Sequence, residues 1–216
     1  MKVLSLDSRF IRMLNRVADM MFVNVIFLIA CIPVFTFGAA KTALYDCAVK
    51  WAIKEDAGVS DFIRAFKANF RSAFLPGILV FLATALLCFD FLLSYSSDAL
   101  VPLRVVAILL MFVVFPYSEQ VFIFLSRFEC GFKDLLRNTL IMVLTNPIRN
   151  ILCAVCMQAP LVIFMSAPVF FLKFTMLWAL GYFSVAAFIS ALLLKKPQEA
   201  IISIHQQQPK ENDPEA

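Results

Sequence analysis

Long apolar stretches separated by short polar connections dominate this chain. A helix needs about 20 apolar residues, at about 1.5 Å per residue, to cross the hydrocarbon core of a bilayer. Four uninterrupted apolar runs reach that length, at residues 73–93, 105–126, 151–172 and 174–194. We therefore predict four membrane-spanning helices.

A fifth apolar run, at residues 20–40, is interrupted by Pro33 and Gly38. Basic residues flank it on both sides, and Lys and Arg collect on the cytoplasmic side of membrane proteins. A single crossing would place those flanks on opposite sides of the membrane. We therefore predict that residues 20–54 enter the membrane and return, with a turn near Pro33 and Gly38, where helix continuity is weak. The segment either crosses twice or forms a re-entrant hairpin, whose turn must be buried in protein. We expect this hairpin to pack in the bundle interior.

Together these segments predict an all-α, polytopic membrane helical bundle. We expect about six helices arranged as three hairpins, namely four clear spans plus the broken or re-entrant first hairpin. Residues 1–196 are predicted to form a single integral membrane domain. Residues 197–216 are polar and predict a disordered cytoplasmic tail. Both termini are expected in the cytoplasm.

Two amphipathic helices are predicted on the cytoplasmic side, at 60–72 and 132–145. The first begins at Ser60, a residue that favours helix N-caps, and has a phenylalanine face next to a basic arc. The residues of this face and arc are Phe62, Phe66, Phe70, Arg64, Lys67 and Arg71. Such a helix either anchors on anionic lipid headgroups or contacts a soluble partner.

Composition narrows the class of protein further. Hydrophobic residues make up 62% of the chain and the mean hydropathy is +0.87, whereas apolar residues are about half of a soluble domain. The single histidine, His205, lies in the tail, and the six cysteines lack the spacing of a metal site or disulfide framework. We therefore expect no enzyme, no cofactor, no metal and no nucleic-acid partner; the lipid bilayer is the expected surrounding.

Ionisable and polar residues at membrane depth are candidates for function, because their burial is costly. The candidate intramembrane polar site comprises Lys41, Glu119, Gln158, Asn24, Thr42 and Tyr45. A Lys41–Glu119 pair is one hypothesis, because the Glu119 charge needs a partner. Two interpretations stay open: a buried pair or protonated Glu that fixes helix packing, or residues that line a solute or ion path.

A dense motif lies in the first third of the chain. It reads Asn15-Arg16-Val-Ala-Asp19, then Asn24, then Pro33-Val-Phe-Thr36-Phe-Gly38-Ala39-Ala-Lys-Thr42-Ala43-Leu44-Tyr45, and finally Phe62 with Phe66-Lys67-Ala-Asn69-Phe70. The motif resembles the YesL family of bacterial membrane proteins, which contain the domain of unknown function 624. The resemblance implies a bacterial plasma-membrane protein of unassigned molecular activity, from loci shared with sugar transport permeases and sensor kinases.

The motif residues themselves suggest structural roles. Gly38, Ala39 and Ala43 allow close helix approach, and Pro33 sets the turn. Asn24, Thr36 and Thr42 are expected to satisfy backbone groups there.

The sequence and the resemblance together favour an accessory or regulatory component of carbohydrate uptake or sensing. Its expected partner is a sugar transport permease or a sensor kinase. The alternative is a small solute transporter or channel with Glu119 and Lys41 along its path.

Overall fold

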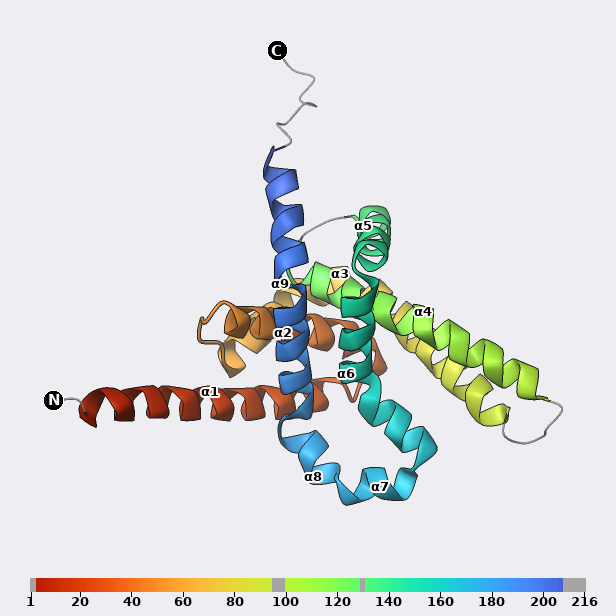
Figure 1. Ribbon diagram of the computed structural model, residues 1–216, viewed down its shortest axis with the longest axis horizontal. Coiled ribbons are helices and arrows are strands. Elements are labelled where there is room, and N and C mark those ends of the chain that lie inside the picture. Colours follow the sequence, from red (N-terminus) through yellow and green to blue (C-terminus); the bar gives the residue numbers. More distant parts are fainter. Residues whose placement is uncertain (1–2, 95–99, 129–130, 208–216) are drawn as a thin grey trace, which may run out of the picture.

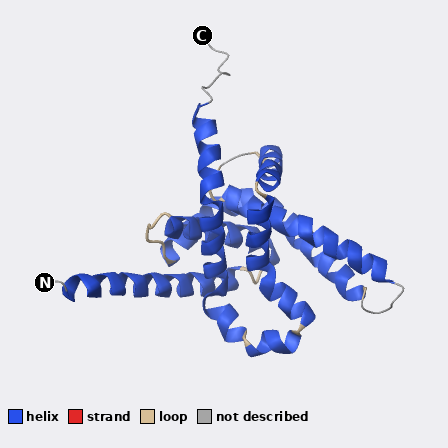
Figure 2. Ribbon diagram, viewed as in Figure 1, coloured by secondary structure: helices blue, strands red, loops and turns tan. Residues whose placement is uncertain are grey.

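Helices make up almost all of the residues that the structure describes, and no strand occurs among them (Figure 2). The computed structural model describes residues 3–94, 100–128 and 131–207. In chain order the elements are α1 (Val3–Ala30), the 3-10 turn η1 (Val34–Thr36), α2 (Phe37–Ala52), α3 (Val59–Leu93), α4 (Val101–Leu125), α5 (Phe132–Thr145), α6 (Pro147–Ser166), α7 (Pro168–Lys173), α8 (Thr175–Leu177), the π-helical turn η3 (Trp178–Tyr182) and α9 (Phe183–Gln207). The predicted all-α class is confirmed.

Five segments in the described part of the chain are long and apolar enough to cross a bilayer. They are Met13–Ala30 in α1, then α3, α4, α6, and Thr175–Lys195, which includes η3 and the first half of α9. Large apolar side chains face outward along them, as lipid contact requires; Phe22 and Phe112, for example, are about three-fifths exposed. The four predicted spans are therefore present, and α1 adds a fifth candidate.

The helices pair into three hairpins, as predicted. α1 packs on α2, α3 packs on α4, and α6 packs on α9 across the short helices α7 and α8. Figure 1 shows the α3–α4 hairpin extending away from the other helices on one side, while the N-terminal half of α1 extends on another.

Helix α2, the return limb of the first hairpin, is the core of the bundle. Twelve of its 16 residues are buried, and it contacts α1, α3, α4 and α9. Half of its residues are small, and Ala40, Ala43 and Ala48 have no exposed surface. At about 1.5 Å per residue, α2 is too short to span the hydrocarbon fully. Its burial agrees with the expectation that this hairpin packs inside the protein.

Helix α1 departs from that expectation, because it lies at the periphery. Met13 is 71% exposed and Ile29 is 59% exposed. The outward side of α1 is apolar, so it can contact lipid and does not need to be buried in protein. Only α2 is the buried limb of the first hairpin.

The turn between α1 and α2 lies where Pro33 and Gly38 predict it. The Thr36 hydroxyl donates to the carbonyl oxygens of Ala30 and Pro33, both at 2.6 Å, and the Thr42 hydroxyl donates to Gly38 O at 2.9 Å. The predicted role of Thr36 is confirmed, because its hydroxyl bonds across the break to Ala30 O. The Ala30 carbonyl, at the end of α1, thereby has a hydrogen-bond partner away from water. Thr42 instead bonds one turn back within α2.

The two ends of the first hairpin meet on one side of the bundle. The Arg16 guanidinium donates to Lys54 O at 3.2 Å and to Asp56 Oδ1 at 3.3 Å. The chain between α1 and the α2–α3 loop therefore leaves this side and returns to it. This arrangement matches the reasoning from the basic flanks.

Helices α2 and α3 cross at two glycines in nearly direct backbone contact. A Cβ atom placed on Gly38 would lie 2.2 Å from Ala73 O and 2.7 Å from Gly77 Cα. Pro76, inside α3, is buried beside this crossing. Gly38 was predicted to allow close approach; Gly77 was not singled out.

The predicted amphipathic helices have different outcomes. The segment 60–72 is not separate but is the start of the 35-residue helix α3, because no proline or glycine interrupts the chain before Pro76. Its N-cap is Gly58, not Ser60, and the Gly58 N–H donates to Asp61 Oδ2 at 3.2 Å. The second predicted helix is present as α5.

Helix α9 continues through Gln207 into the predicted disordered tail, and residues 208–216 of that tail lie outside the described residues.

Alanine at either glycine of the α2–α3 crossing should destabilise the fold. Gly38→Ala and Gly77→Ala each force two backbones apart, and overpacking of this kind costs about 1–3 kcal/mol. Reversible unfolding in mixed detergent micelles measures the loss. Gly181→Ala is the matched control, because its Cβ would meet Met21 Cγ at an ordinary 3.8 Å. Equal stability of Gly77→Ala and wild type would contradict the close crossing.

Candidate functional site: a buried carboxylate shared by three hairpins

Glu119 lies in α4, three residues after Pro116, and has no exposed surface. Its carboxylate accepts hydrogen bonds from three side chains. Lys41 Nζ lies 2.7 Å from Oε1, Gln158 Nε2 lies 3.1 Å from Oε1, and Tyr45 OH lies 2.5 Å from Oε2. We call Lys41, Tyr45, Glu119 and Gln158 the Glu119 cluster.

The Glu119 cluster draws on all three hairpins. Lys41 and Tyr45 come from successive turns of α2, four residues apart, so both point to the same side of that helix. Glu119 comes from α4 and Gln158 from α6. One carboxylate therefore ties the first, second and third hairpins to each other.

Lys41 is nearly as buried as its partner. The side chains of Lys41 and Glu119 are 5% and 1% exposed. The Lys41 ammonium also lies 5.6 Å from the Phe37 ring centroid and 5.1 Å from that of Phe122. Aromatic faces attract a cation, most strongly where water is absent. The ammonium thus has a carboxylate and two rings in place of water.

Paired burial makes this arrangement tolerable in an apolar surrounding. An unpaired charge at this depth is costly, and a pair offsets that cost only with good geometry and further hydrogen bonds. Three donors on one carboxylate meet that condition. The predicted Lys41–Glu119 pair is present, with Tyr45 and Gln158 completing it.

The remaining candidates of the predicted intramembrane site lie elsewhere. Thr42 bonds to its own helix at Gly38, as described above. Asn24, on α1, donates to Trp178 O at 3.1 Å and to Ala179 O at 2.7 Å, and its Oδ1 accepts from Ser184 N at 3.1 Å. It was expected to satisfy the turn near Pro33. Instead it satisfies the backbone at the π-helical turn η3, where the regular helical hydrogen bonds are interrupted.

A further buried polar contact was not predicted. Gln120, next to Glu119, donates through Nε2 to Asn150 Oδ1 of α6. Asn150 Nδ2 in turn donates to Met142 O at 3.1 Å and Asn146 O at 2.9 Å, which fixes the α5–α6 bend. The sequence carries a signal for this contact. Gln120 lies where the apolar run 105–126 is interrupted, and Asn150 directly precedes the run 151–172.

The first turns of α3 expose only part of the predicted cytoplasmic surface. Phe62 is 1% exposed and joins the core, and its ring stacks on Phe66, which packs on Phe70. Phe62 therefore cannot anchor in lipid, because the bundle itself covers it. Arg64, Lys67 and Arg71 are exposed.

Lys50 lies 2.7 Å from Asp46 and 3.5 Å from Asp61, which links the end of α2 to the start of α3.

The fold and the Glu119 cluster define an all-α, polytopic membrane protein. Residues 20–91 match the family described as "Protein of unknown function, DUF624". The predicted resemblance is confirmed for this region, which holds Asn24, Lys41, Tyr45 and both crossing glycines. Comparison with curated proteins and with solved structures gave no match. Within the described residues, no group of three His, Cys, Asp or Glu is placed to hold a metal ion.

Neutralising one member of the Lys41–Glu119 pair should cost far more than neutralising both. Lys41→Met or Glu119→Gln alone leaves a buried charge without its partner, at a cost of about 3–5 kcal/mol. The double variant leaves no charge, so its stability should exceed that of at least one single variant. Charge exchange, Lys41→Glu with Glu119→Lys, should also recover part of the folded protein. Strictly additive losses, measured by detergent unfolding, would show that the pair is not coupled.

Asn24→Leu should loosen the contact between α1 and α9. It removes the bonds that Asn24 makes to the Trp178 and Ala179 carbonyls and to the Ser184 N–H, and a buried polar group that loses its partner costs about 1–3 kcal/mol. Hydrogen exchange at residues 178–184 should rise in this variant. Asn69→Ala is the control, because the Asn69 amide bonds within its own helix, to Ala65 O; equal exchange in the two variants would remove Asn24 from this role.

Proposed function

We propose that this protein is an accessory component of carbohydrate uptake or sensing, which acts by binding other proteins of the bacterial plasma membrane and has no enzymatic activity. The observation that carries the proposal is the closure of the Glu119 cluster. Its carboxylate is fully buried and holds three donors. A group with every bond made within the fold suits a structural tie better than a site that must bind and release a solute.

The link to carbohydrate uptake rests on the resemblance to the YesL family. The DUF624 match supports that resemblance without assigning an activity. A sugar transport permease or a sensor kinase is accordingly the proposed partner.

The cytoplasmic start of α3 is the proposed contact with that partner. Arg64, Lys67 and Arg71 are exposed there, on a helix that the buried ring of Phe62 holds against the core. A rigid basic surface suits an acidic cytoplasmic segment of a partner. The contact between Arg16 and the α2–α3 loop supports a common, cytoplasmic side for these basic segments and for the N-terminus.

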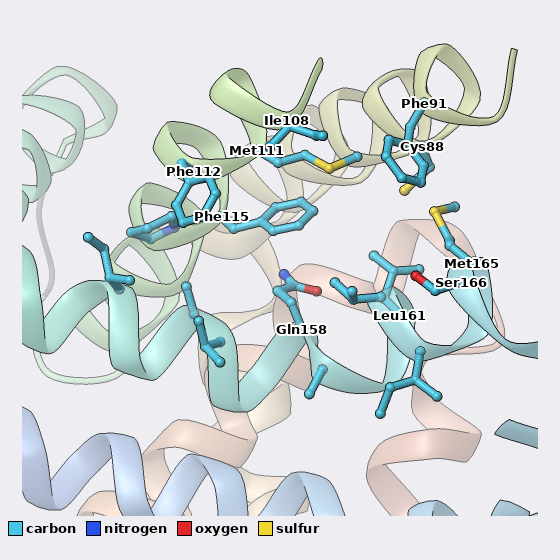
Figure 3. Close-up of a pocket in the computed structure, with 17 residues that line it drawn as sticks. Cys88, Phe91, Ile108, Met111, Phe112, Phe115, Gln158, Leu161, Met165 and Ser166 are labelled. Atoms are coloured by element: carbon cyan, nitrogen blue, oxygen red, sulfur yellow. The ribbon is translucent and has the colours of Figure 1, made fainter. Parts of the chain in front are cut away.

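A solute transporter or channel is the second candidate, and one observation favours it. Gln158 contacts Glu119 and also lines a cavity between α4 and α6 (Figure 3). A path through that cavity would reach the cluster at Gln158. Apart from Gln158 and Ser166 the cavity lining is apolar, which disfavours passage of a sugar or an ion.

Reversal of the basic surface should remove the partner without unfolding the protein. In the triple variant Arg64→Glu, Lys67→Glu, Arg71→Glu, the amount of permease or kinase recovered by crosslinking and purification from the native host should fall at least about tenfold, as for loss of several interfacial charges. Lys173→Glu, an exposed charge distant in sequence on α7, is the control.

Two outcomes would contradict the proposed function. The triple variant would retain the same partner in the same amount, or the purified wild-type protein in liposomes would carry a solute flux that Glu119→Gln abolishes. The second outcome would establish the transporter instead.

A further inference from the structure

A cavity of 430 Å³ lies between the α3–α4 hairpin and α6. Figure 3 shows Cys88 and Phe91 of α3 and Met111 and Phe115 of α4 on one side, facing α6 on the other. Its volume lies within the range of small-molecule sites, about 300–1,000 Å³.

In a bilayer, the open side of the cavity would meet the hydrocarbon region. All three helices that form its walls are long and apolar enough to cross a membrane. Among the lining residues, Phe112, Val155 and Val162 are 60%, 57% and 50% exposed, whereas Ala154 and Phe115 are 4% and 8% exposed, so the cavity has an open side and a buried side. An occupant can therefore enter sideways from the bilayer.

The lining excludes most kinds of ligand. Gln158 and Ser166 supply its only side-chain oxygen or nitrogen atoms, and Gln158 Nε2 already donates to Glu119. A sugar or a charged solute would lose its hydration without finding replacement hydrogen bonds, which is unfavourable. A helix of a partner protein also fits poorly. One helical turn, about 10 Å wide and 5.4 Å long, fills roughly 420 Å³, so a single turn would take up the whole 430 Å³ cavity.

We propose that this cavity binds an acyl chain of a bilayer lipid. The chain matches the apolar walls, and its source lies at the mouth. The occupant also contacts Gln158, the member of the Glu119 cluster that borders the cavity. The inference is independent of the proposed accessory function.

Filling the cavity tests the proposal. Ala159 lines it from α6, so Ala159→Phe places a ring in the space of the chain; Leu152→Phe is the control on the same helix, because Leu152 is 47% exposed and does not line the cavity. The full chain is purified in mild detergent and its retained lipids are counted by native mass spectrometry. Retention of one lipid per chain is expected for wild type and Leu152→Phe, with at least a tenfold loss in Ala159→Phe. If Ala159→Phe does not fold, the smaller Ala159→Leu replaces it.

A second measurement locates the lipid. The protein is reconstituted in vesicles of phosphatidylglycerol that carries a photoactivatable diazirine near the middle of one acyl chain. Crosslinks should concentrate on residues 108–116 and 151–166, and Ala159→Phe should reduce them there alone. Crosslinks spread evenly over all exposed helix faces, or lipid retention unchanged in a folded cavity-filling variant, would overturn the proposal.

Discussion

The Glu119 carboxylate and its three donors are the interaction on which the arrangement of the helices depends. An ionised group in an apolar surrounding must find its partners within the protein. Those partners come from α2 and α6, while Glu119 itself is on α4. Leaving lipid for a neighbouring helix gives an apolar side chain no hydrophobic driving force, so apolar surface alone discriminates weakly among neighbours. The carboxylate discriminates strongly, because it accepts only a small set of positioned donors.

The rest of the core allows α2 to reach that carboxylate. Gly38 and Gly77 let α2 and α3 approach to backbone contact, and the small residues of α2 keep it narrow enough to lie among four neighbours. Asn24 then fixes α1 against the π-helical turn η3, at a point where the backbone of the last hairpin needs hydrogen-bond partners. Close packing of small residues and hydrogen bonds between helices thus hold this bundle together, whereas hydrophobic burial holds together a water-soluble protein.

Much of this could be predicted from the sequence, because two of its signals are physical constraints of the membrane. Run length identified the spans, and the basic flanks of residues 20–40 indicated the return limb that is α2. Lys41 and Glu119 were paired because neither charge can be buried alone. Other contacts depend on rotation and depth of helices, which hydropathy does not report. Asn24 therefore meets η3 instead of the nearby turn, and Gly77 and the Gln120–Asn150 contact were not foreseen. Phe62 was predicted on the lipid or partner surface but lies in the core. A phenylalanine face can pack against lipid or protein, so its sequence pattern does not distinguish the two.

The central claim is that one carboxylate couples α2 of the first hairpin to α6 of the third. Tyr45 on α2 and Gln158 on α6 both donate to Glu119, to opposite oxygens. The direct test is a double-mutant cycle of Tyr45→Phe and Gln158→Leu, measured by reversible unfolding in wild type and again with Glu119→Gln. The account predicts a coupling free energy of about 0.5–3 kcal/mol in wild type that collapses when the carboxylate is removed. Additive losses in wild type, or the same coupling without the carboxylate, would contradict it.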